Sequence, residues 1–147
     1  MTVEEYLMGY QDSIHRLRYI EEEQRYLRAN LTRTTPGYGG IGVSHGTNVN
    51  KIPDAIARSE ELDKEYQEES ARAVQTMKEV RNCIMSVSDT KLRDVLTMRY
   101  ILGYPIKNIA AELGVSPNRA SELHRKAISS IVEYIRFKDD APVEHLD

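Results

Sequence analysis

Two short amphipathic patterns meet at a tight turn in the C-terminal half of the chain. Each repeats apolar residues at the i, i+3, i+4, i+7 spacing that places them on one face of a helix. Between them, Gly114 can adopt the left-handed conformation that ends a helix, Ser116 can cap the next helix, and Pro117 suits its first turn. A helix-turn-helix is therefore predicted, with the buried faces Ile106, Ile109, Ala110 and Leu113, then Ala120, Leu123, Ala127, Ile128 and Ile131.

A long helix is predicted at the start of the chain, over 3–33. It begins at a capping box, Thr2-Val3-Glu4-Glu5, and no proline interrupts it. A helix cannot bury such an apolar stripe alone, so a second element must cover it. The stripe comprises Leu7, Tyr10, Ile14, Leu17, Ile20, Leu27 and Leu31.

A second long helix is predicted over 54–87, after a glycine-rich loop at 34–52. The loop has no preceding strand and no following Gly-Lys-Ser/Thr, so it lacks the pattern of a phosphate-binding loop. The seam of the second helix alternates spacings of four and three, and it is apolar at its ends and polar in its middle. Together the two helices predict a hairpin over 1–88. Pairing within one chain and pairing with a second copy are equally compatible with the pattern.

A third pattern follows this hairpin. Residues 86–90 supply caps for a helix from Lys91 to Leu102, which Gly103-Tyr104-Pro105 ends. This helix and the helix-turn-helix form a predicted module over 89–138, and 139–147 form an acidic tail. The predicted fold class is all-α, a long antiparallel helical hairpin followed by a three-helix module.

The net charge of −3 is divided unevenly along the chain. Residues 89–138 carry nine Lys and Arg against five Asp and Glu, whereas the rest carries eleven against eighteen. A basic module joined to an acidic arm is typical of a protein that contacts DNA locally.

The start of the chain lacks the basic and apolar regions of a signal peptide, and no stretch approaches the roughly 20 apolar residues of a membrane span. A single cysteine, Cys83, cannot form an internal disulfide, and its helical context predicts a small buried side chain. We therefore expect a cytoplasmic protein.

The sequence does not favour an enzyme. Its four histidines lie in four different segments, and no pair has the spacing of metal ligands. The motifs HExxH, CxxC, GxSxG and the P-loop do not occur. We expect no catalytic residues, no cofactor and no metal site.

The predicted helix 117–131 offers a DNA-reading face. In a helix-turn-helix the second helix enters the major groove with its N-terminal residues at the base edges. Asn can pair with adenine, Arg with guanine, and Glu can accept from cytosine. The alternative is that these are merely exposed polar residues of a helical bundle. The candidate base readers are Asn118, Arg119, Ser121 and Glu122; the other candidate contacts are Lys107, Asn108, Ser116, Pro117, Arg125 and Lys126, of which Lys107, Asn108, Arg125 and Lys126 suit phosphates.

The stretch LRDVLTMRYILGYPIKNIAAELGVSPNRASELHRKAISSI resembles region 4 of sigma-70-type factors. The likeness lies in the RDVLTMRY helix, the IAAELGVS helix and turn, and the closing RKAISSI. The whole layout is similar to the ArpU/RinA-like late-gene activators of phages and prophages, which begin with an EYL helix, as Glu5-Tyr6-Leu7 does here. This resemblance implies promoter-region DNA as ligand and RNA polymerase as a partner to test.

Housekeeping sigma factors place Arg and Gln at positions that read the promoter, whereas this chain has Pro117, Asn118, Ser121 and Glu122 there. A DNA element other than the usual promoter hexamer is therefore expected.

These observations give the hypothesis of a sequence-specific DNA-binding transcription regulator of phage or prophage genes, acting in the cytoplasm of a bacterial host. The long helices would serve a homodimer or a contact with polymerase. Two alternatives stay open: a coiled-coil or polymerase-docking adaptor without DNA specificity of its own, and a small terminase subunit.

Overall fold

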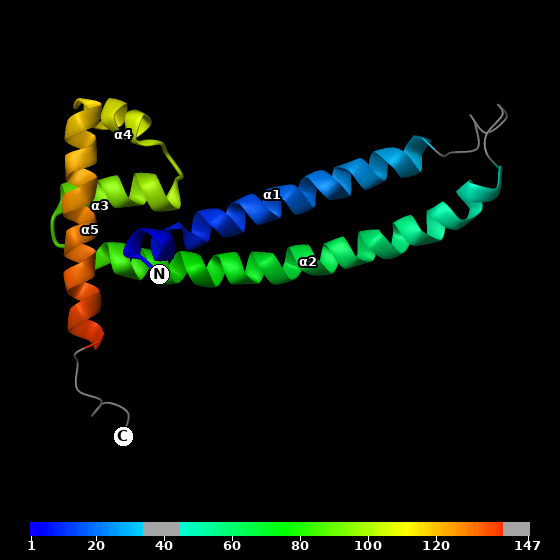
Figure 1. The fold of residues 1–147 in the computed structure, drawn as a ribbon, viewed down its shortest axis with the longest axis horizontal. Coiled ribbons are helices and arrows are strands. Elements are labelled where there is room, and N and C mark those ends of the chain that lie inside the picture. Colours follow the sequence, from blue (N-terminus) through cyan, green and yellow to red (C-terminus); the bar gives the residue numbers. More distant parts are fainter. Residues whose placement is uncertain (34–44, 140–147) are drawn as a thin grey trace, which may run out of the picture. The chain divides into compact units, whose positions relative to one another are not determined.

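The protein is helical in the part of the chain that the structure describes (Figure 1). This computed structural model describes the backbone of residues 1–33 and 45–139 and the side chains of residues 1–31 and 52–135. The predicted all-α class is confirmed, and no strand occurs within these ranges. The elements are α1 (Val3–Arg33), α2 (His45–Met85), α3 (Thr90–Leu96), the π-helix η2 (Thr97–Ile101), α4 (Ile106–Leu113) and α5 (Pro117–Asp139).

The chain divides into two compact units, and each long helix contributes to both. The hairpin unit is Ser13–Ala73; the module unit joins Met1–Asp12 to the chain from Val74 onward. Residue 88, where the predicted hairpin ends, lies inside the module unit.

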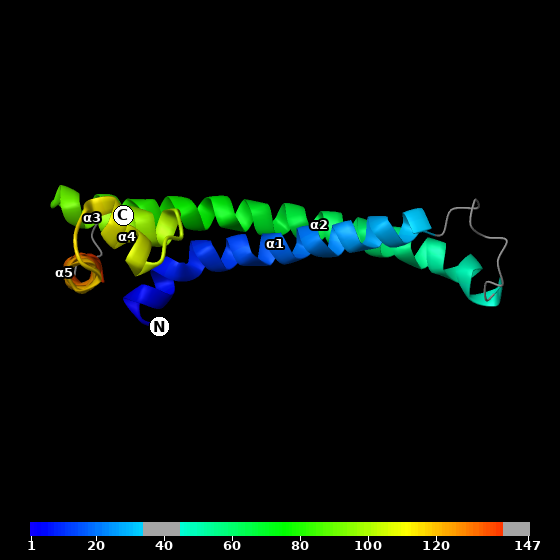
Figure 2. The same ribbon diagram turned by 90° about the horizontal axis from the view of Figure 1, so that it is seen from above.

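In the hairpin unit, α1 and α2 run antiparallel (Figure 2), and polar contacts hold them in register. Across the pair, Arg16 Nε lies 2.7 Å from Glu69 Oε1, and Arg58 Nη2 lies 2.6 Å from Glu23 Oε2. Leu62 and Ala73 are buried among these contacts. The middle of the seam is thus joined mainly by ion pairs and hydrogen bonds, because its sequence offers few apolar positions there.

Glu69 is a charged residue buried in that seam, with only 5% of its surface exposed. Burial raises the pKa of its carboxyl, but this effect is outweighed by hydrogen bonds to Arg16 and Ser13 and by the charges of Arg16 and Arg72, so the pKa is lowered overall. Glu69 is therefore held ionised between the two helices.

The second long helix begins earlier than the sequence predicted. It starts at His45 rather than at 54, and it contains Pro53 in its interior. Proline removes one backbone hydrogen bond but does not prevent helical residues on either side of it, so it was a misleading start signal. The rest of the predicted loop, 34–44, and the predicted tail from residue 140 lie outside the described residues.

One apolar core joins the elements of the module unit. Leu7 of α1 and Ile84 of α2 are buried in the same cluster as Leu96 of α3, Ile109 of α4 and Ile131 of α5. Figure 1 shows α5 passing across the C-terminal turns of α2. The ends of the long helices therefore complete the core of the three-helix module.

The start of α1 is fixed by the predicted capping box. The Thr2 backbone N–H donates to Glu5 Oε2 at 2.9 Å, and the Glu5 N–H donates to Thr2 Oγ1 at 3.1 Å. This reciprocal pair satisfies two backbone donors of the first turn. The predicted helix start is confirmed.

The helix predicted over 91–102 is shorter and ends in a π-helical turn. Asp89 caps α3 by accepting from the N–H groups of Lys91 and Leu92. In η2 the Leu102 N–H donates to the Thr97 carbonyl, five residues back, at 3.0 Å. Such a widened turn is invisible to a 3.6-residue periodicity, which is why one regular helix was predicted.

The end of η2 is held by the first helix of the chain. Gln11 Nε2 donates to the carbonyls of Tyr100, at 3.3 Å, and Ile101, at 2.9 Å. Gly103 follows with φ 75°, and a Cβ atom on it would lie 2.6 Å from Gln11 Oε1. The left-handed backbone favours glycine here, and a Cβ at this position would also displace the end of the Gln11 side chain.

Candidate nucleic-acid interface

The turn between α4 and α5 has the local chemistry that the sequence predicted. Gly114 has φ 67° and ends α4 in the left-handed conformation. The Val115 N–H donates to the Ala110 carbonyl at 3.0 Å, and the Gly114 N–H to the Ala111 carbonyl at 3.2 Å. These two bonds form a Schellman motif, which satisfies the last carbonyls of α4 and turns the chain sharply.

The next helix starts within two residues of that turn. Ser116 Oγ accepts from the Arg119 backbone N–H at 3.1 Å, and Pro117 is the first residue of α5. Both predicted helix-start signals are confirmed. Because the helix dipole places partial positive charge at this end, the start of α5 favours nearby anions.

The inner and outer faces of α5 separate as predicted. Ala120, Leu123, Ala127 and Ile131 are buried, and Ile128 is half-buried. On the outer face, Ser121 is half-buried. The remaining candidate contacts are all exposed: Lys107, Asn108, Ser116, Pro117, Asn118, Arg119, Glu122, Arg125 and Lys126. The fold therefore brings residues from α4, the turn and the first half of α5 to the surface.

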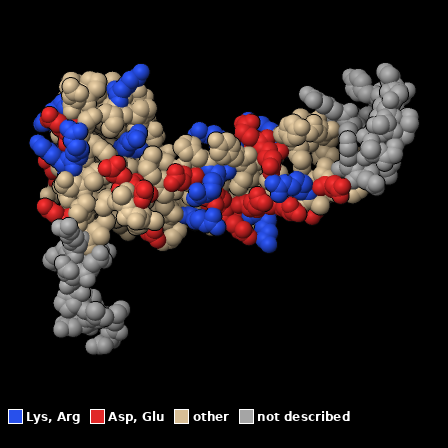
Figure 3. All heavy atoms as spheres, viewed as in Figure 1, with Lys and Arg blue, Asp and Glu red and all other residues tan. Residues whose placement is uncertain are grey.

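Charge on this surface is mostly positive. Figure 3 shows Lys and Arg side chains over α4 and the adjoining half of α5, with fewer acidic ones, whereas both signs alternate along the hairpin unit. The outer face of α5 itself presents Arg119, Arg125 and Lys126 against a single carboxylate, Glu122, within residues 117–131. A surface of this kind can contact phosphates.

The one carboxylate on that face is paired with a candidate base reader. Arg119 Nη1 lies 3.1 Å from Glu122 Oε2, one helical turn away. The two side chains are 46% and 52% exposed, so the pair stands in solvent. Two candidate base readers are thus in contact with each other.

A polar pair of buried Tyr100 and half-buried His124 lies behind the outer face. The Tyr100 hydroxyl is 2.7 Å from His124 Nε2, so η2 is linked to α5 by a hydrogen bond. Burial lowers the pKa of His124 and raises the pKa of Tyr100 to about 12. At neutral pH both groups are therefore uncharged, which suits their position inside the module.

Sequence reasoning did not single out Tyr100, His124 or Gln11. Tyr100 continues the spacing of four from Leu92 through Leu96, a signal that could have placed it in the core. His124 lies four residues after the buried Ala120 and could have been placed at the edge of the inner face. Gln11 gives no such signal, because its partner carbonyls lie about 90 residues further along the chain.

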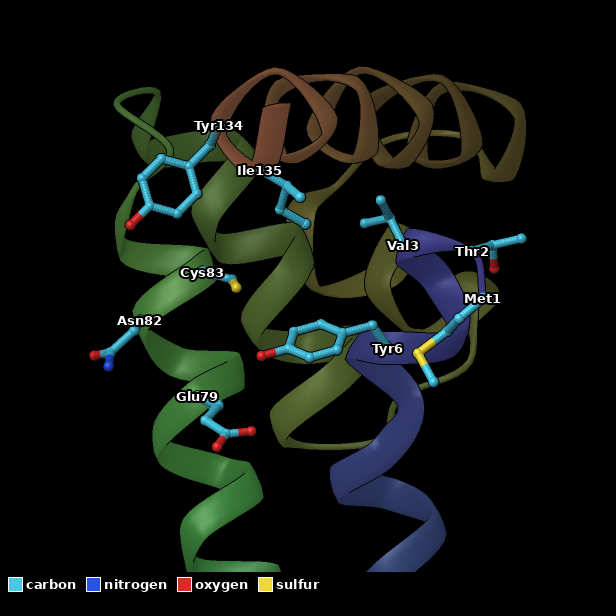
Figure 4. A pocket seen from close by; sticks show the side chains of 9 residues that line it. All are labelled: Met1, Thr2, Val3, Tyr6, Glu79, Asn82, Cys83, Tyr134 and Ile135. Atoms are coloured by element: carbon cyan, nitrogen blue, oxygen red, sulfur yellow. The ribbon is translucent and has the colours of Figure 1, made fainter. Parts of the chain in front are cut away.

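A cavity of about 450 Å³ lies elsewhere in the module unit, lined by the start of α1 and the ends of α2 and α5 (Figure 4). The Tyr6 ring extends across it with its hydroxyl toward α2, and burial, followed by Cys83 and Glu79, raises the pKa of Tyr6. Cys83 is half-buried in its wall. None of the candidate DNA contacts lines this cavity, so it is separate from the outer face of α5.

The described residues contain no group of three or more His, Cys, Asp and Glu side chains arranged to hold a metal ion. No helix among them is long and apolar enough to cross a membrane.

Comparison with known proteins gives one match. Residues 89–127 match the family described as sigma-70, region 4, which is a DNA-binding helix-turn-helix domain. The match runs from the cap of α3 into α5 and contains all ten candidate DNA contacts. No curated protein and no solved structure matches the chain. The sequence match and the geometry thus agree on a sigma-4-like helix-turn-helix in this part of the chain.

Proposed function

We propose that this protein is a sequence-specific DNA-binding transcription regulator of phage or prophage genes, acting in the cytoplasm of a bacterial host. The observation that carries the proposal is the exposed face at the start of α5, where Asn118, Arg119 and Glu122 follow a capped turn on a helix whose other face is buried. In a helix-turn-helix these are the positions that meet base edges in the major groove.

The remaining candidate residues would orient the module on the duplex. Lys107 on α4 and Arg125 and Lys126 on α5 are exposed and positively charged, so they suit phosphate oxygens on both sides of the reading residues. Ser116 already accepts a backbone hydrogen bond, and its hydroxyl proton can be donated to a phosphate. These contacts would supply affinity, and the residues at the start of α5 would supply selectivity.

The long helices would raise the affinity of a single module. One helix-turn-helix buries a limited DNA surface and contacts few phosphates. A second copy bound through the helices, or RNA polymerase bound nearby, would add the missing contacts. The resemblance to phage late-gene activators, with the EYL sequence at the start of α1, supports this layout.

The proposal is tested by selecting bound sequences from random duplex DNA with the full chain. We expect an enriched motif and retention on nonspecific DNA at low salt, because phosphate contacts are salt-sensitive. A variant with Lys107, Arg125 and Lys126 all changed to Ala should lose retention, whereas the same change at Lys64, Lys78 and Arg81 of the exposed α2 surface should not. A chain that binds no DNA at low salt would contradict the proposal and favour the protein-interaction adaptor.

A further inference from the structure

The ion pair between Arg119 and Glu122 lies where the proposed regulator would meet bases. It joins the third and sixth residues of α5, and both side chains stand on the outer face. In water such an exposed pair is weak, because solvent screens it. In a groove from which water is excluded the same attraction becomes stronger, so the pair matters most in the bound state.

The geometry of the pair leaves base-reading groups on both partners. Arg119 uses Nη1 toward Glu122, and the rest of its planar guanidinium can still donate two parallel hydrogen bonds to guanine O6 and N7. Glu122 uses Oε2, and its Oε1 can accept from the amino group of cytosine. Three residues of helix advance about 4.5 Å, against about 3.4 Å per base along one strand, so the two groups would meet neighbouring base pairs.

We infer that Arg119 and Glu122 act as one reading unit, in which Glu122 holds the guanidinium and determines specificity. This inference rests on the proposed function. The carboxylate enters a groove that is rich in acceptor atoms and flanked by phosphates, so it disfavours most sequences. It is tolerated where an amino group of the DNA donates to it while Arg119 bonds a guanine. The preferred ligand is therefore duplex DNA with a guanine and a cytosine at adjacent steps.

The unit predicts opposite effects of one substitution on two duplexes. Glu122→Ala should weaken binding to the selected duplex, because a carboxylate that accepts from the DNA is lost. It should strengthen binding to a scrambled duplex, because a carboxylate without a donor is removed from the groove. Good base contacts discriminate by about fivefold to a hundredfold. The dissociation constant for the scrambled duplex divided by that for the selected duplex should therefore fall by at least about fivefold. Glu133→Ala is the matched control, since it removes the same charge from an exposed position further along α5.

A double-mutant cycle tests the coupling directly. Arg119→Ala should weaken binding to the selected duplex more strongly in the natural chain than in the Glu122→Ala background. In the natural chain the substitution leaves the Glu122 carboxylate unpaired in the groove, whereas in the other background that carboxylate is absent. Circular dichroism should show unchanged helix content, as alanine is a strong helix former at exposed positions. Additive effects in the cycle, or an unchanged ratio for Glu122→Ala, would overturn the inference while leaving selective DNA binding intact. Failure of the natural chain to bind any duplex would instead overturn the proposed function and, with it, this inference.

Discussion

Gly103→Ala is expected to destabilise the protein more than Gly114→Ala, although both glycines have a left-handed backbone. Their φ angles are 75° and 67°, so an alanine at either position costs about 1–2 kcal/mol of backbone strain. Around Gly114 nothing lies within 4 Å of the added Cβ, whereas at Gly103 the Cβ would lie 2.6 Å from Gln11 Oε1. Only Gly103→Ala must displace a neighbouring side chain.

Displacing Gln11 breaks its two hydrogen bonds to the end of η2. Each such bond contributes about 0.5–1.5 kcal/mol, so Gly103→Ala should cost about 1–3 kcal/mol more than Gly114→Ala. The entropy that alanine removes from the unfolded chain is common to both variants and cancels in the comparison. Urea unfolding of the full chain, followed by far-UV circular dichroism, measures the difference when the m-values agree.

Gln11→Ala, alone and combined with Gly103→Ala, separates the backbone strain at residue 103 from the clash with Gln11. Once Gln11→Ala has removed the obstructing side chain, adding Gly103→Ala should cost only about as much as Gly114→Ala does alone. If Gly103→Ala costs no more than Gly114→Ala in the natural background, or if its cost is the same with and without Gln11, the proposed role of Gln11 is wrong.

Two pH effects on stability follow from the buried polar groups. Burial lowers the pKa of folded His124, so as pH falls through about 6.5 the unfolded chain takes up a proton first and the free energy of unfolding decreases; His124→Gln should remove this part of the decline in urea midpoints. Arg16 and its neighbours lower the pKa of folded Glu69, so its contribution is present above about 4.5 and is lost as pH falls below that value. Glu69→Gln should therefore be less sensitive to acid than the natural chain, and an identical acid profile would contradict the ion pair.

Much of the fold could be predicted because it depends on local chemistry. Apolar spacing and the cap residues Thr2, Gly114 and Ser116 act within a few residues of themselves, so they can be read along the chain. The two sides of α5 followed from the same periodicity. Both the all-α class and the buried and outer faces of α5 could therefore be predicted from the sequence.

The features that were missed depend on partners distant in sequence. The π-helical turn η2 is held by Gln11, and no local pattern connects the two. The early start of α2 contradicts the usual meaning of Pro53, because a helix can tolerate one lost hydrogen bond when its neighbours continue it.

At the candidate site, the i, i+3 spacing of Arg119 and Glu122 was visible in the sequence, and it could have predicted their ion pair. The base-reading role proposed for the two side chains depends on how the module docks on DNA, which the spacing within one helix does not determine. The exposed face was thus predictable from local periodicity, whereas its register on a duplex was not.

The most direct test compares Arg119→Ala with Lys126→Ala on a selected duplex, its single-base variants and a scrambled duplex, across a salt titration. If α5 reads the major groove, Arg119→Ala should weaken binding to the selected duplex by about 1–3 kcal/mol and relax the preference at the base position that Arg119 reads. Lys126→Ala should weaken all duplexes alike and flatten the slope of log K against log salt by about one unit. If Arg119→Ala instead weakens every duplex equally, or if Lys126→Ala leaves the salt slope unchanged, the outer face of α5 does not bind DNA in this way.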